Sequence, residues 1–289
     1  MSNNDPRIVN GYKQPDGTNF IDICHLFASN IHADADGDHC LYFNDHMAPM
    51  FANASTYIPP IKNAGTKVLL SVLGDWQHVG VANMTETQAD RFADILVYVV
   101  DTYGLDGISF DDEYADYTYT LPTSYSRIIK ALKAKFDRRY GIGTKLITVF
   151  QWGNYSQIDA TAGAMLDYAD YGTFGASFFA YSCAISGVSN AHWMPTSLNL
   201  GTAVTDFRTL NKIKNNATTI KNNGYGGYML FNIRRYSDVS PLNVLQKIAS
   251  GYGTSVSYVT GSDYAPWAPT SGVTITKNDV PAYPPTYTD

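Results

Sequence analysis

The chain has 289 residues, 45% of them hydrophobic and only 16% charged, and this composition excludes a disordered protein. Its formal net charge of −6 excludes the basic surface that nucleic-acid binding requires, so no nucleic-acid partner is expected. No apolar stretch approaches the ~18–20 residues that span a membrane. A chain of this length can form one large core, and (β/α) barrels are commonly of this size.

The first predicted elements alternate between strand and helix. An apolar run at 20–28 predicts a strand, and Lys67–Leu73, short and nearly all apolar, predicts a parallel strand that is buried on both faces. A helix is expected over 85–103 because Thr85 and Gln88 have capping-box spacing and a glycine follows its last turn.

The next strand carries the most informative pattern in the sequence. An apolar run at 105–110 leads directly into Asp111, Asp112 and Glu113. Side chains alternate along a strand, so Ser109, Asp111 and Glu113 share one face. Two neighbouring carboxyls oppose each other's ionisation, which raises the pKa of one and supplies an acid beside an anion. The alternative is a strand that runs out into a solvated acidic loop.

The same alternation continues to the end of the periodic sequence. The further elements expected are a helix at 123–139, strands at 145–151 and 169–178, a helix at 203–223, a strand at 225–233, and a helix that opens at Ser240 and Pro241 and closes near Gly251. Repeated β–α units predict a parallel α/β fold, and their number favours a closed (β/α)8 TIM-type barrel as a single domain.

The expected organisation has three parts. Residues 1–19 form an N-terminal extension, 20–252 form the catalytic barrel, and 253–289 form a tail rich in Pro, Tyr and Thr without periodicity. The tail is either packed on the barrel or a remnant of a linker.

A barrel would place the acidic pattern where catalysis occurs. Active sites of (β/α) barrels lie at the carboxyl ends of the strands. Ser109, Asp111 and Glu113 would face the interior of the barrel there, whereas Ile108 and Phe110 would face the helices. This placement favours a catalytic role over a solvated loop.

These residues resemble a known family. Residues 106–113 are similar to the Asp-x-x-Asp-x-Asp-x-Glu signature of glycoside hydrolase family 18, and residues 71–74 are similar to that family's Ser-x-Gly-Gly strand. The closer likeness is to endo-β-N-acetylglucosaminidases of the endoglycosidase H and F types. It extends over roughly 20–252 and rests on the segments 67–74, 111–114 and 224–228, which occur in the same order.

The resemblance implies a barrel hydrolase that needs no cofactor and no metal. Such enzymes cleave the β-1,4 bond between the two core N-acetylglucosamines of an N-glycan, and the 2-acetamido oxygen of the substrate attacks C1. By position, Glu113 would protonate the leaving oxygen, and Asp111 would orient the acetamido N–H and stabilise the oxazolinium ion. Packing beside Asp111 is expected to keep Glu113 protonated near neutral pH.

Three positions depart from the family pattern. Ser109 replaces a motif Asp, although its hydroxyl is expected to hydrogen-bond Asp111, and Phe174 and Phe150 stand where relatives have Tyr. Loss of one such hydroxyl costs ~10²–10³ in rate by analogy with oxyanion-hole donors. These departures motivate a second hypothesis, a catalytically weakened glycan-binding relative. A third hypothesis is a family 18 hydrolase of chitin-like chains, against which the likeness to the endo-acting branch speaks.

Other residues near strand ends are candidates for substrate contact. Trp152 and Trp76 could stack on sugars, with loop packing as the alternative for Trp152, and Asn232 could hydrogen-bond a sugar. Asp112 is expected to make a structural hydrogen bond. The alternating aspartates at 34–38 faintly resemble a calcium loop, but the remaining ligands are missing, so a solvated turn is expected.

The expected partner is an N-glycan or the carbohydrate of a glycoprotein, and the chain is expected to be a monomer. The N-terminus lacks the charged and apolar regions of a signal peptide. The chain is therefore either cytoplasmic or exported with a leader that this sequence lacks. The implied substrate favours a secreted, periplasmic or cell-surface location.

Overall fold

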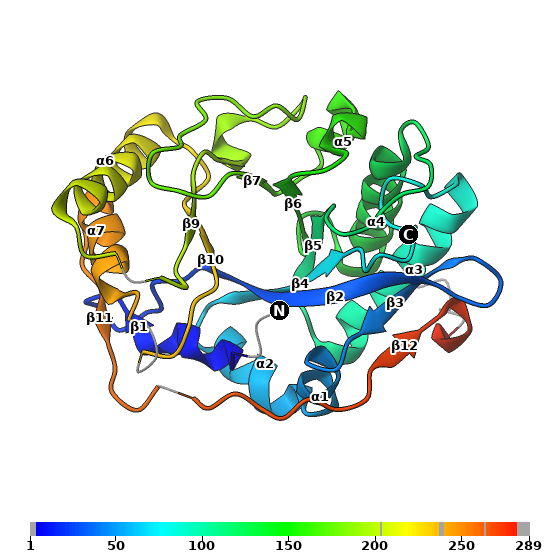
Figure 1. Ribbon diagram of the computed structural model, residues 1–289, viewed down its shortest axis with the longest axis horizontal. Helices are drawn as coiled ribbons and strands as arrows, with labels where there is room; N and C mark the ends of the chain where they lie inside the picture. Colours follow the sequence, from blue (N-terminus) through cyan, green and yellow to red (C-terminus); the bar gives the residue numbers. More distant parts are fainter. Residues whose placement is uncertain (1–3, 203, 237–239, 263, 282–289) are drawn as a thin grey trace.

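The computed structural model describes residues 4–202, 204–236, 240–262 and 264–281. Its parallel strands follow one another in chain order around a ring (Figure 1). The first five are β2 (Ile23–Ala33), β4 (Lys67–Leu73), β5 (Gly107–Asp111), β6 (Leu146–Gln151) and β7 (Tyr168–Tyr171), each paired with the next.

Three shorter strands complete the ring. β8 (Trp193–Met194) pairs with β7, and β9 (Ser197–Asn199) pairs with β10 (Met229–Phe231). β10 returns beside β2, where the rings of Phe231 and Phe27 lie 5.3 Å apart in edge-to-face contact. The fold is a single-domain TIM-type (β/α)8 barrel, as the sequence predicted.

The helices cover the outside of the ring, with α6 and α7 opposite α3 and α4 (Figure 1). Phe110 makes an edge contact with the ring of Tyr125 on α4, as expected for a strand residue that faces the helices. None of the helices in the described ranges combines the length and hydrophobicity needed to cross a bilayer. The helices are α1 (Met47–Ala52), α2 (Ala54–Asn63), α3 (Glu86–Tyr103), α4 (Ser124–Tyr140), α5 (Ala160–Gly163), α6 (Phe207–Asn223) and α7 (Leu242–Tyr252).

Local signals fix the ends of α3 as the sequence predicted. Thr85 and Gln88 form both hydrogen bonds of a capping box, and Gly104, at φ 64°, ends the helix. The helix that was expected to begin at residue 203 begins later, as α6. Residue 203 itself lies outside the described residues. Asp206 accepts a hydrogen bond from the Thr209 N–H at 2.8 Å, and this cap begins the helix at Phe207.

Two predicted strands and one helix have different limits. β2 continues past residue 28 to Ala33, and β10 is shorter than 225–233. The strand expected over 169–178 ends at Tyr171, and beyond it Phe174 keeps an isolated parallel bridge with Ser197 of β9. The last helix is capped by Pro241, one residue beyond the expected cap.

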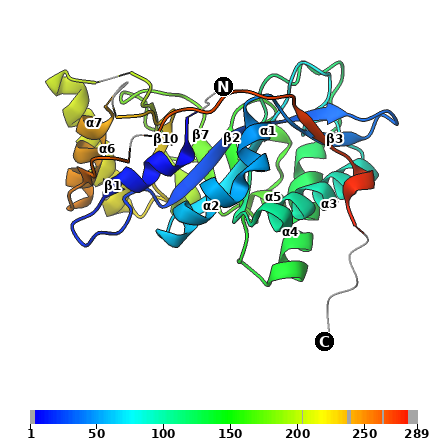
Figure 2. The same ribbon diagram turned by 90° about the horizontal axis from the view of Figure 1, so that it is seen from below.

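Additional strands lie outside the ring and involve both terminal segments. β3 (His39–Phe43) folds back antiparallel to β2, and β12 (Val273–Ile275) pairs antiparallel with β3. β1 (Tyr12–Lys13) pairs with β11 (Ser257–Tyr258). The described part of the tail is therefore packed on the barrel, along the side that carries α1 (Figure 2). The domain limits at 19 and 252 stay a prediction.

Candidate active site

The acidic motif lies at the carboxyl end of β5. Asp111 is the last residue of the strand and is 6% exposed, whereas Glu113 follows it and is half-buried. The Oδ1 atom of Asp111 is buried and has no hydrogen-bond partner among the described residues. In the strand register Asp111 lies beside Phe150 of β6. A buried carboxyl oxygen without a partner is available to a donor on a ligand.

The segment after β5 is fixed against the end of β4. The Gly74 N–H donates to the Glu113 carbonyl at 2.9 Å, and the Trp76 N–H donates to the Tyr114 carbonyl at 2.6 Å. A Cβ at position 74 would lie 2.4 Å from the Cα of Ala115, so only glycine allows this approach. The glycine that ends the Ser-Val-Leu-Gly strand therefore positions the backbone of Glu113.

Asp112 points away from its two acidic neighbours and is structural, as predicted. Its carboxylate accepts hydrogen bonds from the Tyr117 hydroxyl at 2.6 Å and from the Asn154 backbone and side-chain N–H groups at 2.7 and 2.9 Å. These bonds connect the segment after β5 to the segment after β6. The carboxyls on either side of Asp112 take no part in these bonds, and the charge of Glu113 acts on Asp111.

Burial raises the pKa of both candidate catalytic carboxyls. Desolvation, reinforced by the charges of Glu113, Asp112 and Asp170, raises the pKa of Asp111 to about 8. Desolvation alone raises the pKa of Glu113. The expectation that Asp111 holds the proton on Glu113 needs correction. Burial raises the pKa of Glu113, and the repulsion acts on Asp111.

Ser109 also differs from its expected role. It is 3% exposed and lies two residues before Asp111 on β5, but no hydrogen bond joins the two within the described ranges. Ser109 is aligned between Ser71 of β4 and Thr148 of β6. The Thr148 hydroxyl is buried and likewise has no partner among the described residues. On β4, β5 and β6 the row below Asp111 is therefore composed of small hydroxyl residues.

The sequence analysis missed a second buried carboxyl, Asp170. It is 2% exposed on β7, and strand register places it in the same row as Phe150 and Asp111. Desolvation raises its pKa to about 7. A single acidic residue inside a short apolar strand was the signal that could have identified it, because such residues are rarely buried without a function.

Aromatic rings line the interior of the barrel beside these carboxyls. The ring of Phe174 lies 5.7 Å from that of Phe150 and 5.5 Å from that of Phe231. Phe231 also contacts Phe27 of β2. Phe150 is 7% exposed, Phe174 is 37% exposed, and Phe231 and Phe27 are half-buried, so the row combines a buried ring with rings that solvent can reach.

Exposed aromatic side chains gather on one edge of the molecule. We define the carboxyl-terminal rim as the segments that follow the carboxyl ends of the parallel strands. Where a helix comes next in the chain, the first residue of that helix is included. Every aromatic residue that is exposed within the described ranges lies in this rim. They are Trp76, Tyr114, Tyr119, Trp152, Phe174, Phe178, Tyr181, Phe207 and Tyr236.

The remaining predicted contact residues also lie in the rim. Trp76 is 61% exposed and Trp152 is 48% exposed, on the segments after β4 and β6. Asn232 follows β10 with φ 61°, and its side-chain amide donates to Asn199 at 3.5 Å. Asn232 is thus at a strand end as expected, but it is hydrogen-bonded to the neighbouring strand end.

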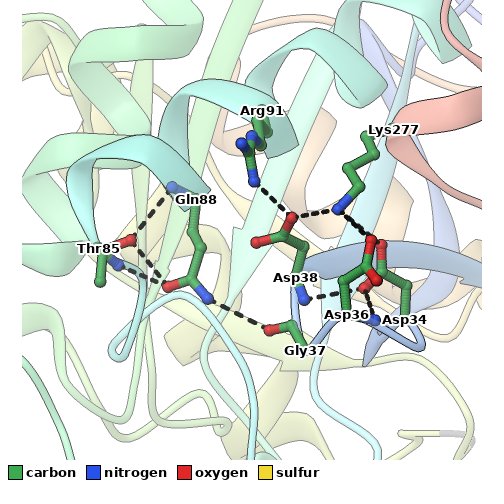
Figure 3. Close-up of polar contacts among 8 residues, drawn as sticks. All are labelled: Asp34, Asp36, Gly37, Asp38, Thr85, Gln88, Arg91 and Lys277. Atoms are coloured by element: carbon green, nitrogen blue, oxygen red, sulfur yellow. Dashed lines mark hydrogen bonds and ion pairs between the residues drawn. The ribbon is translucent and has the colours of Figure 1, made fainter.

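The aspartates at 34–38 form an ion-paired turn. Lys277 donates to Asp36 at 2.7 Å and to Asp38 at 2.6 Å, and Arg91 of α3 donates to Asp38 at 2.6 Å (Figure 3). The expectation of a merely solvated turn is therefore corrected. In the part of the chain that the structure describes, no group of three His, Cys, Asp or Glu side chains is arranged to hold a metal ion.

Comparison with known proteins identifies the family. Residues 18–182, more than half of the chain, match Glycosyl hydrolases family 18. The chain belongs to glycosyl hydrolases family 18. The family 18 match includes β4, the acidic strand β5 and the rim segments that follow β4, β5 and β6.

Two proteins that are similar to this chain in sequence share the name endo-beta-N-acetylglucosaminidase. The chain is 32% identical to an endo-beta-N-acetylglucosaminidase of Flavobacterium sp. (strain SK1022) over 268 residues, 86% of this chain and 77% of that protein. It is 30% identical to endo-beta-N-acetylglucosaminidase F1 of Elizabethkingia meningoseptica over 227 residues, which cover 74% of this chain and 63% of that protein.

A solved structure shares the fold. The crystal structure of Bacteroides thetaiotamicron EndoBT-3987 with Man5GlcNAc product superposes with a TM-score of 0.69 at 23% identity. The superposition covers 92% of this chain and 63% of that one. Family 18 membership and the barrel are thus established, while this chain spans less than two thirds of the length of both EndoBT-3987 and endo-beta-N-acetylglucosaminidase F1.

Proposed function

We propose that this protein is an endo-β-N-acetylglucosaminidase that cleaves the β-1,4 bond between the two core N-acetylglucosamines of N-glycans. The observation that carries the proposal is the pair of carboxyls at the end of β5, Asp111 buried and Glu113 half-buried, each with a raised pKa. Two relatives at 30–32% identity carry this activity in their names. EndoBT-3987, which shares the fold, was crystallised with a Man5GlcNAc product.

The proposed reaction uses the substrate's own acetamido group. Glu113 donates its proton to the glycosidic oxygen while the acetamido carbonyl oxygen attacks C1 and the C1–O bond breaks. Asp111 accepts a hydrogen bond from the acetamido N–H and stabilises the cationic oxazolinium. A water molecule then attacks C1 from the opposite face, the bond between C1 and the acetamido oxygen breaks, and the proton released by the water returns to Glu113. Two displacements at C1 retain the anomeric configuration.

Substrate binding would redistribute the proton between the two carboxyls. In the free site the deeper burial of Asp111 favours its protonated form. An acetamido N–H donor and the developing positive charge both favour the anion of Asp111, so the proton moves to the less buried Glu113. The acid then faces the leaving oxygen, and the anion faces the oxazolinium.

The rim supplies surfaces suited to sugars. Aromatic faces pack against the C–H faces of pyranose rings, and all exposed aromatic residues of the described chain are gathered here. Within this proposal Phe150 and Phe174 contact the sugar whose bond is cleaved, and Trp76, Trp152 and Asn232 contact neighbouring sugars. Ser109 supports the layer beneath Asp111.

One assay tests the activity. The protein is incubated with a high-mannose glycoprotein, and loss of the glycan is followed by electrophoretic mobility and by mass spectrometry. Glu113→Gln should reduce cleavage by at least about 10²-fold, because general acid catalysis contributes that much. Glu86, in the first turn of α3, is the only other glutamate in the chain, so Glu86→Gln is a matched control that should retain activity.

A second candidate function is glycan binding without efficient turnover. Phe150 and Phe174 lack the hydroxyl expected of a catalytic contact, and the Ser109 hydroxyl makes no hydrogen bond with Asp111. In the same assay, uncleaved glycoprotein together with saturable binding of the released glycan would favour this function. Cleavage by the unchanged protein that Glu113→Gln abolishes would exclude it.

The proposed substrate also bears on location and assembly. Glycoproteins that carry N-glycans are found mainly outside cells, so we propose a secreted, periplasmic or cell-surface enzyme that acts as a monomer on the carbohydrate of glycoproteins. Fractionation of the producing cells tests the location, and light scattering of the purified protein tests the oligomeric state. Residence in the cytoplasm or a stable dimer would contradict the respective proposal.

A further inference from the structure

A segment far from the barrel strands in sequence lies along the rim. We call residues 267–279 the C-terminal strap. At its start the Trp267 indole N–H donates to the His46 carbonyl at 2.6 Å, and its ring packs against Tyr57. In its middle β12 adds an antiparallel strand to β3, with Ile275 opposite Leu41. The strap thus covers the outer edge of the β2–β3 hairpin.

The end of the strap holds the tip of that hairpin. Lys277 donates to Asp36 and Asp38, and its ammonium lies 3.8 Å from a carboxylate oxygen of Asp34 (Figure 3). The Gln88 side chain from the start of α3 donates to the Gly37 carbonyl at 3.2 Å. Lys277 faces all three carboxylates of this five-residue turn and offsets their repulsion together with Arg91, which pairs with Asp38.

The middle of the strap contacts the face of the hairpin. A Cβ at Gly272 would lie 2.1 Å from the Tyr42 hydroxyl and 2.4 Å from its ring, so the strap backbone lies directly on Tyr42. The Tyr42 ring in turn stacks on His32, with centroids 4.3 Å apart and planes 19° apart. Tyr42 cannot move away from a bulkier strap residue without leaving His32.

His32 connects the hairpin to the segment after β4. Its Nε2 lies 2.8 Å from the Asp75 carboxylate. Asp75 directly precedes Trp76, whose ring lies 5.5 Å from that of Tyr114 and whose N–H donates to the Tyr114 carbonyl. Tyr114 directly follows Glu113. A continuous series of contacts thus runs from the strap to the residues beside the proposed acid.

We propose that the C-terminal strap positions the rim segment 74–78 for substrate binding, with Gly272 and Lys277 as positioning residues. β3 is held on one side by the barrel strand β2 and on the other by β12, and the Lys277 ion pairs fix the turn between β2 and β3, so the strap makes the β2–β3 hairpin a rigid support. For its effect on substrate the inference rests on the proposed function. For its effect on the rim it rests on the contacts alone.

Hydrogen exchange tests the positioning without any assay of activity. Gly272→Ala displaces Tyr42, and Lys277→Ala removes the cation that pairs with Asp36 and leaves Asp38 with Arg91. Both variants should exchange backbone amides faster, by about three- to thirtyfold, in peptides that cover 30–43 and 74–78. Ser271→Ala changes an exposed neighbour in the strap, and Lys130→Ala removes the surface ion pair with Asp159, so neither should change these peptides.

Kinetics with a glycoprotein substrate then test the consequence. The same two strap variants should raise KM by about three- to thirtyfold while kcat stays within about twofold, and Lys277→Arg should restore KM. Unchanged exchange in 74–78 would overturn the strap proposal whether or not the protein cleaves glycans. If the strap variants exchange faster but the parent protein does not cleave glycans, the strap proposal is supported and the proposed function is contradicted. Faster exchange with unchanged KM would overturn the link to substrate binding.

Discussion

At the scale of single residues, Asp111 combines a functional position with a stability penalty. Its carboxyl is buried beside three other acidic groups, which raises its pKa to about 8 from the 3.8 of an exposed Asp. Between these two pH values the folded chain binds a proton that the unfolded chain has released. The free energy of unfolding therefore falls as pH rises from about 4 to about 8.

Asp111→Asn removes this titration, which leads to a prediction with two parts. At pH 9 the variant should be more stable than the parent protein by on the order of a few kcal/mol, and near pH 4 the two should be similar. The variant should also lose most of its cleavage activity. Chemical denaturation at the two pH values measures the difference, and an Asp111→Asn protein that is less stable than the parent at pH 9 would contradict the assigned burial.

The raised pKa of Glu113 leads to a prediction for the basic side of the pH–activity profile. An acid catalyst must carry its proton, and burial raises the pKa of this carboxyl above its usual 4.5. We expect kcat/KM to fall as pH rises through that raised pKa, and to fall later than it would for an exposed glutamate. Initial rates on a glycopeptide across pH 4–9 measure this limb. A profile that rises throughout that range would argue against Glu113 as the acid.

Phe174 allows the weakened-enzyme hypothesis to be tested by a gain of function. Its ring contacts Phe150 and Phe231, and within the proposed site a hydroxyl at its edge could reach the acetamido oxygen of the substrate. Phe174→Tyr should raise kcat by about tenfold or more if this contact is missing in the parent protein. Phe178→Tyr, on an exposed ring of the same segment, is the control. Equal kcat for all three proteins would mean that the acetamido group lies elsewhere.

At the scale of elements, Asp112 connects two rim segments. Its carboxylate accepts three hydrogen bonds from Tyr117 and Asn154. Asp112→Ala should lower the free energy of unfolding by about 2–3 kcal/mol and reduce kcat, because the backbone of Glu113 is then less constrained. Urea denaturation measures the stability, with the exposed Asp116→Ala as control. A loss no greater than that of Asp116→Ala would show that the connection is unimportant.

Some elements were predictable to the residue and others were not. The limits of β4 and α3 follow from local signals, a continuous apolar run and a capping box closed by Gly104. The strand expected over 169–178 was wrong beyond Tyr171, because Phe174 and Phe178 are exposed rim residues and not core residues. Single-sequence patterns do not distinguish apolar residues that fill a core from those that face solvent at a site.

The candidate site was predictable only in part for a related reason. The order of Asp111 and Glu113 along one strand is a local pattern, so their common placement followed from the sequence. Asp170 and the row of phenylalanines join them through strand register, which no local pattern encodes. The hydrogen bond expected between Ser109 and Asp111 is not formed, because the direction of a side chain within a layer depends on packing.

At the scale of the whole molecule, the terminal segments belong to the same core as the barrel. Ile8 and Val9 are 1% and 2% exposed, and Trp267 packs on Tyr57 beneath α2. Neither segment shows periodicity, because β1, β11 and β12 are two or three residues long and pair with distant residues. Their packing depends on tertiary contacts that sequence patterns do not contain.

Trp267 gives a prediction at this scale. Trp267→Ala removes its packing on Tyr57 and its hydrogen bond to His46, and it should lower the free energy of unfolding by about 1–3 kcal/mol. Val259→Ala, at a 47% exposed position, should change it by less than about 0.5 kcal/mol. Thermal denaturation of the three proteins compares them, and equal melting temperatures would mean that the strap is only loosely attached.

The antiparallel pairing of β1 with β11 has a consequence during biosynthesis. β1 precedes every barrel strand in the chain, yet its partner strand is translated only after all of them. Translation adds about 5–20 residues per second, so a nascent barrel waits on the order of seconds for this partner and for Lys277. During that interval the acidic turn has Arg91 but lacks Lys277, and chaperones that recognise incomplete sheets have time to bind.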